Sequence, residues 1–457
     1  MTLARQLLAK VDLKEFVWSF FSRIASPLLS FAVLLMASRT LSIEEYGLYN
    51  FLFSVGSSVG LVLVLGQNVL LMKHFRTSPD TAEEEANRTL LAMNFRWIAS
   101  GIAVALLVAG AIQIFAVDFP HHYDALPIAF VFSCVFALSE YFQYYFRVRG
   151  NIGLALTPRE NIWRILTLAA FPVAAYTGFM TTGARAMEVT TVLLALVVGY
   201  QAIRMVGIEG RVFLRSRRVD MDAETRSIWS RESLFFTANA FFVSAALYLE
   251  TILIGIFLSL EAAAFYFVAF RLAALLMLPV SIIDTIGIPM VSARLQARDI
   301  PGAQHLISVL SAGSFAGTLL AFCFMIAIGK LALSLFEPSF ADHYAVLVVL
   351  CLSPVAHAFF GPGTNLMMIG GGERYFLWMR SLIFVVYIAA LILFGVYFGM
   401  IGIAVVGLVH SFVILLLCRN WTLAHVGVDN MATTVIAAIR HWRGRGGPEA
   451  AGERSDG

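Results

Sequence analysis

The chain has 457 residues, of which 60% are apolar and only 13% are charged, and its formal net charge is +3. Its mean hydropathy is +0.82. A soluble domain cannot bury so much apolar surface while leaving so little polar surface for water. The short alternating segments of a transmembrane β-barrel do not occur either. The composition therefore excludes a soluble domain and predicts an all-α, polytopic membrane protein.

Long apolar runs recur along the chain, and each is close to the about 20 residues that cross a bilayer core roughly 30 Å thick. The first run, from Phe16, is too long for a signal peptide and lacks a small-residue cleavage site, so no cleavable signal is expected. Twelve transmembrane helices are predicted, at residues 16–38, 46–71, 90–117, 126–146, 161–180, 188–207, 233–257, 262–290, 303–329, 343–368, 375–398 and 401–424.

Basic residues are distributed unequally between the two sides of this layout. If the N-terminus is cytoplasmic, most of the 32 Lys and Arg residues fall in inner segments, and the outer loops hold only Arg39, Arg185 and Lys330. Because basic loops resist translocation, we expect both termini to be cytoplasmic.

A short polar turn, LSIEEYGLY, separates the first two predicted helices at residues 41–49. We expect Ser42 to cap the following helix, with acidic residues beside its positive end. Tyr49 is expected near the membrane interface, where a phenol is favoured. A shift of 217 positions places this turn on LSLEAAAFY at residues 258–266, where Ser259 and Tyr266 match. The chain therefore contains two related halves.

Each half has six predicted helices, and because six is even, both halves enter the membrane the same way up. Such repeats are related by an axis along the membrane normal and enclose a substrate path between them. We expect two parallel six-helix bundles, at residues 1–207 and 233–429, joined by a basic cytoplasmic linker at 208–232. The Gly-rich, charged tail at 430–457 is expected to be disordered and cytoplasmic.

Arginines inside the predicted helices need an explanation, because one near the bilayer centre costs about 2.5–3.5 kcal/mol. Arg164 lies near the inner end of its helix and is expected to snorkel to the headgroups. Arg23 and Arg271 lie deeper, roughly 10 and 14 Å from the helix ends at 1.5 Å per residue. Guanidinium groups suit paired phosphate oxygens. We predict that Arg23 and Arg271 contact an anionic headgroup; the alternative is a structural ion pair.

Three acidic residues also lie within the predicted helices, and each is a candidate for binding a coupling proton or sodium ion or for neutralising an arginine: Glu140, Glu250 and Asp284. Residues that interrupt helical hydrogen bonding are hinge candidates: Pro279, Pro354, Gly361, Pro362 and Gly363. The four cysteines are scattered through apolar segments, and no cluster with ligand spacing or glycine-rich phosphate loop occurs. Neither a metal nor a cofactor is expected.

Four stretches resemble a family of transporters. They are LSIEEYGLYNFLFSV followed by VLGQNVLLMKHF, then ETILIGIFLSLEAAAFYFVAFRLAALL, and finally LFEPSFADHYAVLVVL. Together they resemble the polysaccharide-exporting flippases of the multidrug/oligosaccharidyl-lipid/polysaccharide exporter (MOP) superfamily. Two positions depart from the family pattern: Glu250 replaces an aspartate, and Ala264-Phe265 replaces a glycine.

The resemblance implies a protein that moves undecaprenyl-diphosphate-linked oligosaccharide across the bacterial inner membrane by alternating access, for polysaccharide or lipopolysaccharide assembly. The implied partners are this lipid, membrane lipids, a proton or sodium gradient and other polysaccharide-assembly proteins, with no nucleic acid. A multidrug/cation antiporter of the same superfamily is the alternative. A membrane enzyme of polysaccharide assembly is less favoured, because predicted outer loops of about 5–15 residues leave little room for catalytic side chains.

Overall fold

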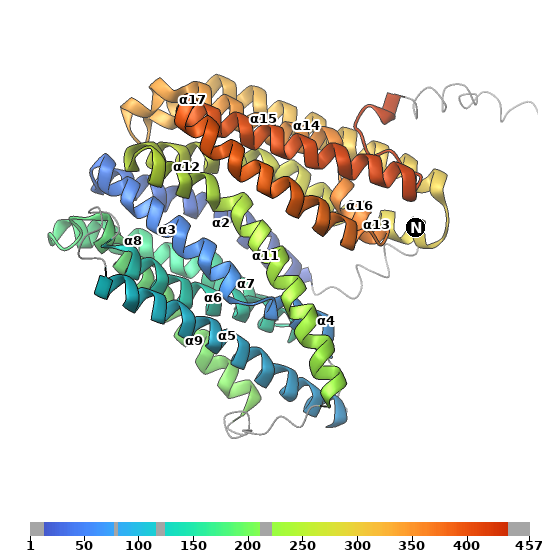
Figure 1. The fold of residues 1–457 in the computed structure, drawn as a ribbon, viewed down its shortest axis with the longest axis horizontal. Coiled ribbons are helices and arrows are strands. Elements are labelled where there is room, and N and C mark those ends of the chain that lie inside the picture. Colours follow the sequence, from blue (N-terminus) through green and yellow to red (C-terminus); the bar gives the residue numbers. More distant parts are fainter. Residues whose placement is uncertain (1–12, 77–80, 116–123, 211–221, 437–457) are drawn as a thin grey trace, which may run out of the picture. The chain divides into compact units, whose positions relative to one another are not determined.

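The computed structural model describes residues 13–76, 81–115, 124–210 and 222–436, and the side chains of 13–24 and 81–83 lie outside this description. All secondary structure in these residues is helical, and nine helical stretches are long and apolar enough to cross a membrane. The predicted all-α, polytopic fold is confirmed. Contacts divide the chain into two compact units, Met1–Phe265 and Tyr266–Gly457, which are described separately below (Figure 1).

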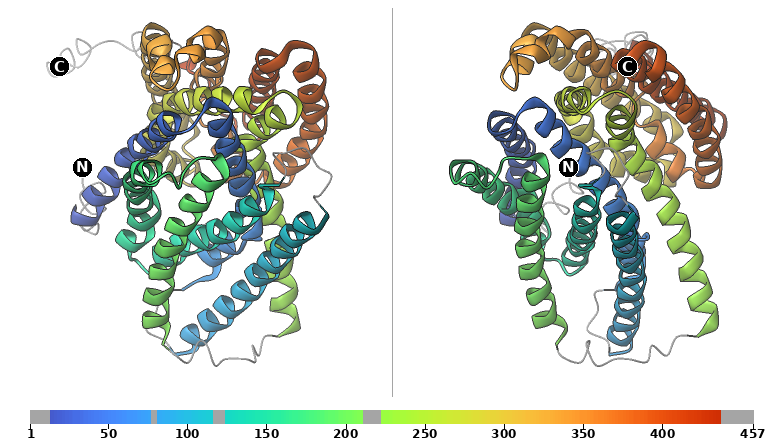
Figure 2. Two further views of the ribbon diagram at one scale, coloured as in Figure 1. Left: turned by 90° about the vertical axis from the view of Figure 1, so that its left-hand side faces the viewer. Right: turned by 60° about the vertical axis from the view of Figure 1, so that its left-hand side comes forward.

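The first unit is a bundle of long helices, of which α5, α6 and α9 are seen clearly in both views of Figure 2. Segments α7, η2 and α8 follow one another without a gap, so they form one helical pass with a π-helical segment at η2. The elements are α2 (Leu13–Thr40), α3 (Ile43–Leu63), α4 (Gln67–His74), α5 (Thr81–Phe115), α6 (Leu126–Val148), α7 (Ile152–Thr157), η2 (Pro158–Ile162), α8 (Trp163–Tyr176), α9 (Gly183–Glu209) and α11 (Ala223–Phe257).

The second unit begins within α12, and its longest helix, α17, contains the last two predicted transmembrane helices. Gly399 bends α17 with a φ of 61° and a ψ of −148°. The segments of α17 before and after Gly399 then run back along each other. The rings of Tyr387 and His410, one from each segment, are stacked with their centroids 4.0 Å apart. The elements are α12 (Leu260–Ala274), η3 (Leu275–Met277), α13 (Leu278–Gln296), α14 (Ile300–Ser334), η4 (Pro338–His343), α15 (Tyr344–Phe360), α16 (Gly363–Ile369) and α17 (Glu373–His425).

The helix-interrupting residues occupy different positions in these elements. Pro279 follows the 3-10 turn η3, which separates α12 from α13. Gly361 ends α15 with a φ of 62°, and Pro362 and Gly363 begin α16. Pro354 lies inside α15 without ending it. The helix therefore changes to a 3-10 turn at η3 without a gap and is broken at Gly361–Gly363. Movement about these positions stays a prediction.

The two repeated turns have the capping structure that the sequence predicts. The Ser42 hydroxyl accepts a hydrogen bond from the backbone N–H of Glu45 at 3.4 Å, and Ser259 accepts one from Ala262 at 3.0 Å. The turns also contact each other, since a Cβ on Gly47 would lie 2.0 Å from the carbonyl oxygen of Leu260. Only glycine permits this approach, which explains its place in the first turn.

The tyrosines of the repeated turns are buried in the protein and do not lie on its surface. Tyr49 and Tyr266 are 2% and 0% exposed. The Tyr49 hydroxyl lies 3.3 Å from the Thr190 hydroxyl, and its ring packs edge-on against Phe171. A buried phenol needs such a polar partner, which α9 supplies. The position of Tyr49 near the membrane interface stays a prediction.

Helix α11 packs along α3 and α4 within the first unit (Figure 1). The hydroxyl oxygens of Ser58 and Ser244 lie 2.6 Å apart in the middle of this contact. Near the start of α11, Glu232 forms an ion pair of 2.6 Å with Lys73, and its other carboxylate oxygen lies 2.6 Å from Nε2 of His74. By its contacts, α11 therefore belongs with the N-terminal helices. The bundle boundaries predicted at residues 207 and 233 follow the sequence repeat instead. Residues 211–221 of the predicted linker lie outside the described residues.

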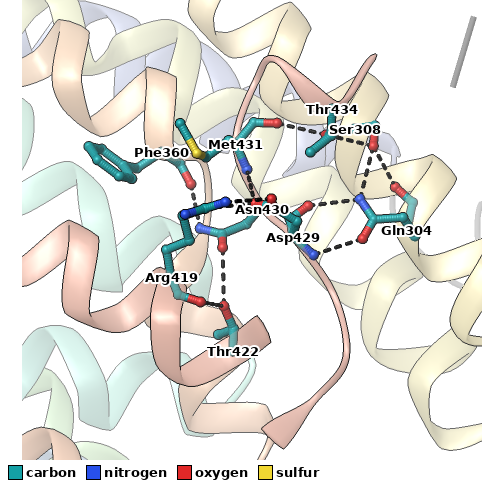
Figure 3. Close-up of polar contacts among 9 residues, drawn as sticks. All are labelled: Gln304, Ser308, Phe360, Arg419, Thr422, Asp429, Asn430, Met431 and Thr434. Carbon is teal, nitrogen blue, oxygen red and sulfur yellow. Dashed lines mark hydrogen bonds and ion pairs between the residues drawn. The ribbon is translucent and has the colours of Figure 1, made fainter. Parts of the chain in front are cut away.

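Residues 426–434 form a strap across the ends of the helices of the second unit (Figure 3). Val428 is fully buried in an apolar cluster with side chains of α13, α14 and α16. Asn430 is also fully buried, and its side-chain amide donates to the carbonyl oxygen of Phe360. The disordered tail was expected to begin at residue 430, but these contacts order the chain through residue 436. Residues 437–457 lie outside the described structure.

Candidate functional site

An ion pair between α6 and η2 lies in the interior of the first unit. The Nη1 atom of Arg159 donates to Oε2 of Glu140 and, at 2.8 Å, to Oε1 of Gln143. The Arg159 and Glu140 side chains are only 14% and 10% exposed. The guanidinium carbon also lies 4.6 Å from the centroid of the Phe136 ring. Arg159 is therefore held by three side chains of α6.

A second ion pair adjoins the first along the chain. Nη1 of Arg164 lies 2.8 Å from Oε2 of Glu160, and the same oxygen accepts a hydrogen bond of 2.5 Å from Ser26 of α2. Arg164 also donates to the backbone carbonyl of Glu160. The arginine that was expected to snorkel thus has a carboxylate partner one helical turn earlier.

The π-helical segment η2 places the two central charges of this network. Pro158 begins the segment and supplies no backbone N–H, which favours a locally widened turn. Arg159 contacts α6 and Glu160 contacts α2, so consecutive residues serve different neighbouring helices. π-Helical turns occur frequently at functional sites, and this one joins α2, α6 and α8.

The network of Glu140, Arg159, Glu160 and Arg164 contains two basic and two acidic groups. Buried charges are tolerated when they are paired and hydrogen-bonded. Each carboxylate here has an arginine partner, so the formal charge of the four groups sums to zero. The described part of the chain contains no group of three or more His, Cys, Asp or Glu residues that could hold a metal ion.

The structure locates the other predicted site residues on several elements. Arg23 lies in α2, one turn before Ser26, but its side chain is outside the description. Glu250 is half-buried in α11. In the second unit, the Arg271 guanidinium lies 4.8 Å from the Phe267 ring, and Asp284 accepts a hydrogen bond of 3.2 Å from Asn365. Glu140 is thus brought into a charged network, whereas Arg271 and Asp284 lie in the other unit.

Sequence reasoning missed Arg159 and Glu160. They were assigned to an inner segment because they precede the predicted helix that begins at residue 161. The available signal was the carboxylate of Glu140, for which neutralising an arginine was one of the expected roles. The separation of 19 residues between Glu140 and Arg159 gives no periodicity that reveals the contact.

The second unit contains an apolar cavity of about 500 Å³ between α14, α15 and α17. Its lining is apolar throughout and includes four phenylalanine side chains: Phe315, Phe359, Phe360 and Phe412. The ring pairs Phe315–Phe359 and Phe360–Phe412 are arranged edge to face. No charged group lines this cavity, so its walls offer only apolar contact.

Comparison by sequence gives no match, either to a family model or to a curated protein. Comparison by structure gives clear matches. A multidrug resistance MATE family transporter of the MOP superfamily, in an inward-facing conformation, matches with a TM-score of 0.67 at 14% identity. The match covers 92% of this chain and 99% of that transporter.

Two other transporters have the same fold. The lipid II flippase MurJ, in an inward closed conformation, matches with a TM-score of 0.64 at 10% identity over 89% of this chain and 87% of that chain. A MOP superfamily transporter from Pyrococcus furiosus, described as having a binding pocket of reversed polarity, matches with a TM-score of 0.53 at 13% identity, over 88% of this chain and 92% of that one. The fold is therefore that of MOP superfamily transporters, which include both multidrug transporters and a lipid flippase.

Proposed function

We propose that this protein is a flippase that moves undecaprenyl-diphosphate-linked oligosaccharide across the bacterial inner membrane by alternating access, in polysaccharide or lipopolysaccharide assembly. The fold supports a transporter, and its similarity to a lipid II flippase supports a lipid-linked substrate. Both termini are proposed to be cytoplasmic, and the partners are the lipid-linked oligosaccharide, a proton or sodium gradient and other polysaccharide-assembly proteins.

The observation that carries this proposal is the pairing of the buried acids in the first unit. A site for a cationic drug needs a carboxylate whose charge is available, because an unpaired charge is what attracts the ligand. Glu140 is engaged by Arg159 and Glu160 by Arg164. This arrangement leaves no free negative charge in the network and favours a cargo that is not a cation.

Arg23 and Arg271 are the proposed contacts for the diphosphate. Each places a guanidinium group within a predicted transmembrane helix, and a guanidinium can donate two parallel hydrogen bonds to phosphate oxygens. Phe267 packs against the guanidinium of Arg271 at 4.8 Å and restricts its orientation. Glu250 and Asp284 remain the proposed groups for ion coupling.

Multidrug/cation antiport is the second candidate, and one observation favours it. Asp284 lies in α13, and its hydrogen-bond partner among the described residues is the neutral amide of Asn365. A carboxylate without a basic partner is a suitable site for a proton, a sodium ion or a cationic ligand. The similarity to a multidrug resistance transporter is consistent with such a role.

Substitution of the two predicted headgroup contacts tests the proposed function. Purified wild-type protein, Arg23→Ala and Arg271→Ala are reconstituted with a short diphosphate-linked glycolipid, and its passage between leaflets is followed with and without an imposed ion gradient. We expect both variants to slow passage at least tenfold, since a charge-assisted hydrogen bond contributes about 1.5–3 kcal/mol, while remaining folded. Normal passage in both variants would show that these arginines do not hold the diphosphate.

A further inference from the structure

The ion pair between Glu140 and Arg159 leaves much of its hydrogen-bonding capacity unused. A guanidinium group carries five N–H donors, but Arg159 donates to the described residues through Nη1 alone. Its Nε and Nη2 groups have no hydrogen-bond partner among those residues. Oε1 of Glu140 and Nε2 of Gln143 are likewise without one, because Glu140 is bonded through Oε2 and Gln143 through Oε1.

These unused groups lie together on α6 and η2. Gln143 lies three residues after Glu140, close to one turn along α6, and both side chains bond to the same nitrogen atom of Arg159. The site therefore presents donors from an arginine and an amide beside an acceptor from a carboxylate. None of these atoms is both fully buried and unpaired, so water reaches the unused groups and a ligand that completes their hydrogen bonds can reach them too.

The charges of the Glu140–Arg159 ion pair limit the kind of ligand that can bind there. Glu140 already neutralises Arg159, so an anion or a cation would enter a low-dielectric site without a net opposite charge to offset its desolvation. A hydroxyl group both donates and accepts hydrogen bonds. Neighbouring hydroxyls on one ring could pair with the Arg159 donors and the Glu140 acceptor at the same time, without any net charge.

The surroundings of the pair also fit a polyhydroxylated ring. The Phe136 ring lies 4.6 Å from the guanidinium carbon of Arg159, and it provides a flat apolar surface beside the polar atoms. The exposed fractions of 14% for Arg159 and 10% for Glu140 leave their outer atoms accessible. A sugar combines an apolar ring face with hydroxyl groups at its edge, so it can contact both kinds of surface.

We propose that Glu140, Gln143 and Arg159 form a binding site for a sugar ring of the transported glycolipid. This inference rests on the proposed function, and it assigns the oligosaccharide to the first unit. Arg159 and Gln143 donate to sugar oxygens, and Glu140 accepts from a sugar hydroxyl. The site distinguishes a glycosylated lipid from the bare diphosphate lipid.

The neighbouring pair of Glu160 and Arg164 provides a matched control. It has the same charge types, and Glu160 directly follows Arg159 in η2, but Oε2 of Glu160 is bonded to both Arg164 and Ser26. Replacing both members of a pair by glutamine removes both charges and keeps polar side chains, and it avoids the unpaired buried charge that a single substitution would leave. The variants are therefore Glu140→Gln/Arg159→Gln and Glu160→Gln/Arg164→Gln.

The experiment measures the affinity of these proteins in nanodiscs for undecaprenyl diphosphate, bare or linked to glucose, galactose or N-acetylglucosamine. We expect the wild-type protein to prefer at least one glycosylated lipid. Glu140→Gln/Arg159→Gln should reduce that preference about tenfold, the loss expected for one charge-assisted hydrogen bond, without changing the affinity for the bare lipid. Glu160→Gln/Arg164→Gln should retain the preference. Gln143→Ala, which keeps the ion pair, should reduce it by a smaller factor and serves if the double variant does not fold.

Retention of the full preference in both Glu140→Gln/Arg159→Gln and Gln143→Ala would overturn the sugar site while leaving the proposed function intact. So would an equal loss of affinity for the bare and the glycosylated lipids. If the wild-type protein binds no diphosphate-linked lipid, the proposed function fails and the sugar site fails with it.

Discussion

The side-chain amide of Asn430 donates a hydrogen bond to the backbone carbonyl of Phe360, the last residue of α15 (Figure 3). The other end of the same amide accepts a hydrogen bond of 3.1 Å from Thr422 of α17. A Cβ on Gly361 would lie 2.4 Å from the backbone oxygen of Asn430. Asn430 thus fixes the chain at the break between α15 and α16, where three hinge candidates are located.

Replacing Asn430 by alanine should destabilise this break. The substitution removes two hydrogen bonds and leaves the Phe360 carbonyl buried without its partner, which costs about 1–3 kcal/mol. We expect a lower unfolding temperature in detergent and faster amide hydrogen exchange in α16. Thr433→Ala is the control, since Thr433 is exposed in the same segment and surface changes usually stay within about 0.5 kcal/mol. Equal exchange in the two variants would show that Asn430 does not hold the break.

Asp429 should make the stability of the strap depend on pH. Its carboxylate pairs with Nε and Nη2 of Arg419 at 2.9 and 2.7 Å, and these hydrogen bonds lower the pKa of Asp429 below its usual value. A lowered pKa stabilises the folded state above the unfolded pKa of about 3.9, and this contribution is lost as the pH falls through the folded value. Thermal unfolding from pH 7 to pH 3 should show a gap between wild type and Asp429→Asn that narrows as the pH falls below about 4. A gap that is constant over this range would argue against the assignment.

Gly47 should tolerate no side chain. A methyl group at this position would lie 2.0 Å from the Leu260 carbonyl oxygen, and overpacking of this kind costs about 1–3 kcal/mol or more. At Gly199, in the interior of α9, a Cβ would have no neighbouring atom within 4 Å. We therefore expect Gly47→Ala to lower the unfolding temperature, whereas Gly199→Ala should be neutral or stabilising by up to about 1 kcal/mol. Indistinguishable unfolding of the two variants would contradict the close contact between the repeated turns.

The repeated turns show what the sequence could predict. Ser42 and Ser259 were identified as helix caps because the signal is local: a hydroxyl side chain, an acidic residue two positions later and an apolar run. Both caps are confirmed. The contact of Gly47 with Leu260 could not be inferred, because it joins residues that are 213 positions apart and depends on how α3 meets the start of α12.

The candidate site was predictable only in part, for the same physical reason. Glu140 was found because a carboxylate in an apolar run is conspicuous, but its partner was not, because Arg159 precedes the predicted helix that begins at residue 161. Only the π-helical turn at η2 places Arg159 against α6. The order of the strap was also missed, since Asp429 and Asn430 resemble solvent-exposed residues until Arg419 and Thr422 are brought beside them.

The most direct test of the account is the cargo of the purified wild-type protein. Proteoliposomes receive either a fluorescent undecaprenyl-diphosphate-linked oligosaccharide or a cationic dye, and the movement of each is measured under proton and sodium gradients. The account predicts that the glycolipid crosses between leaflets at a rate well above that of protein-free liposomes, and that the dye is not transported. Transport of the dye under an ion gradient, with no movement of the glycolipid, would contradict it.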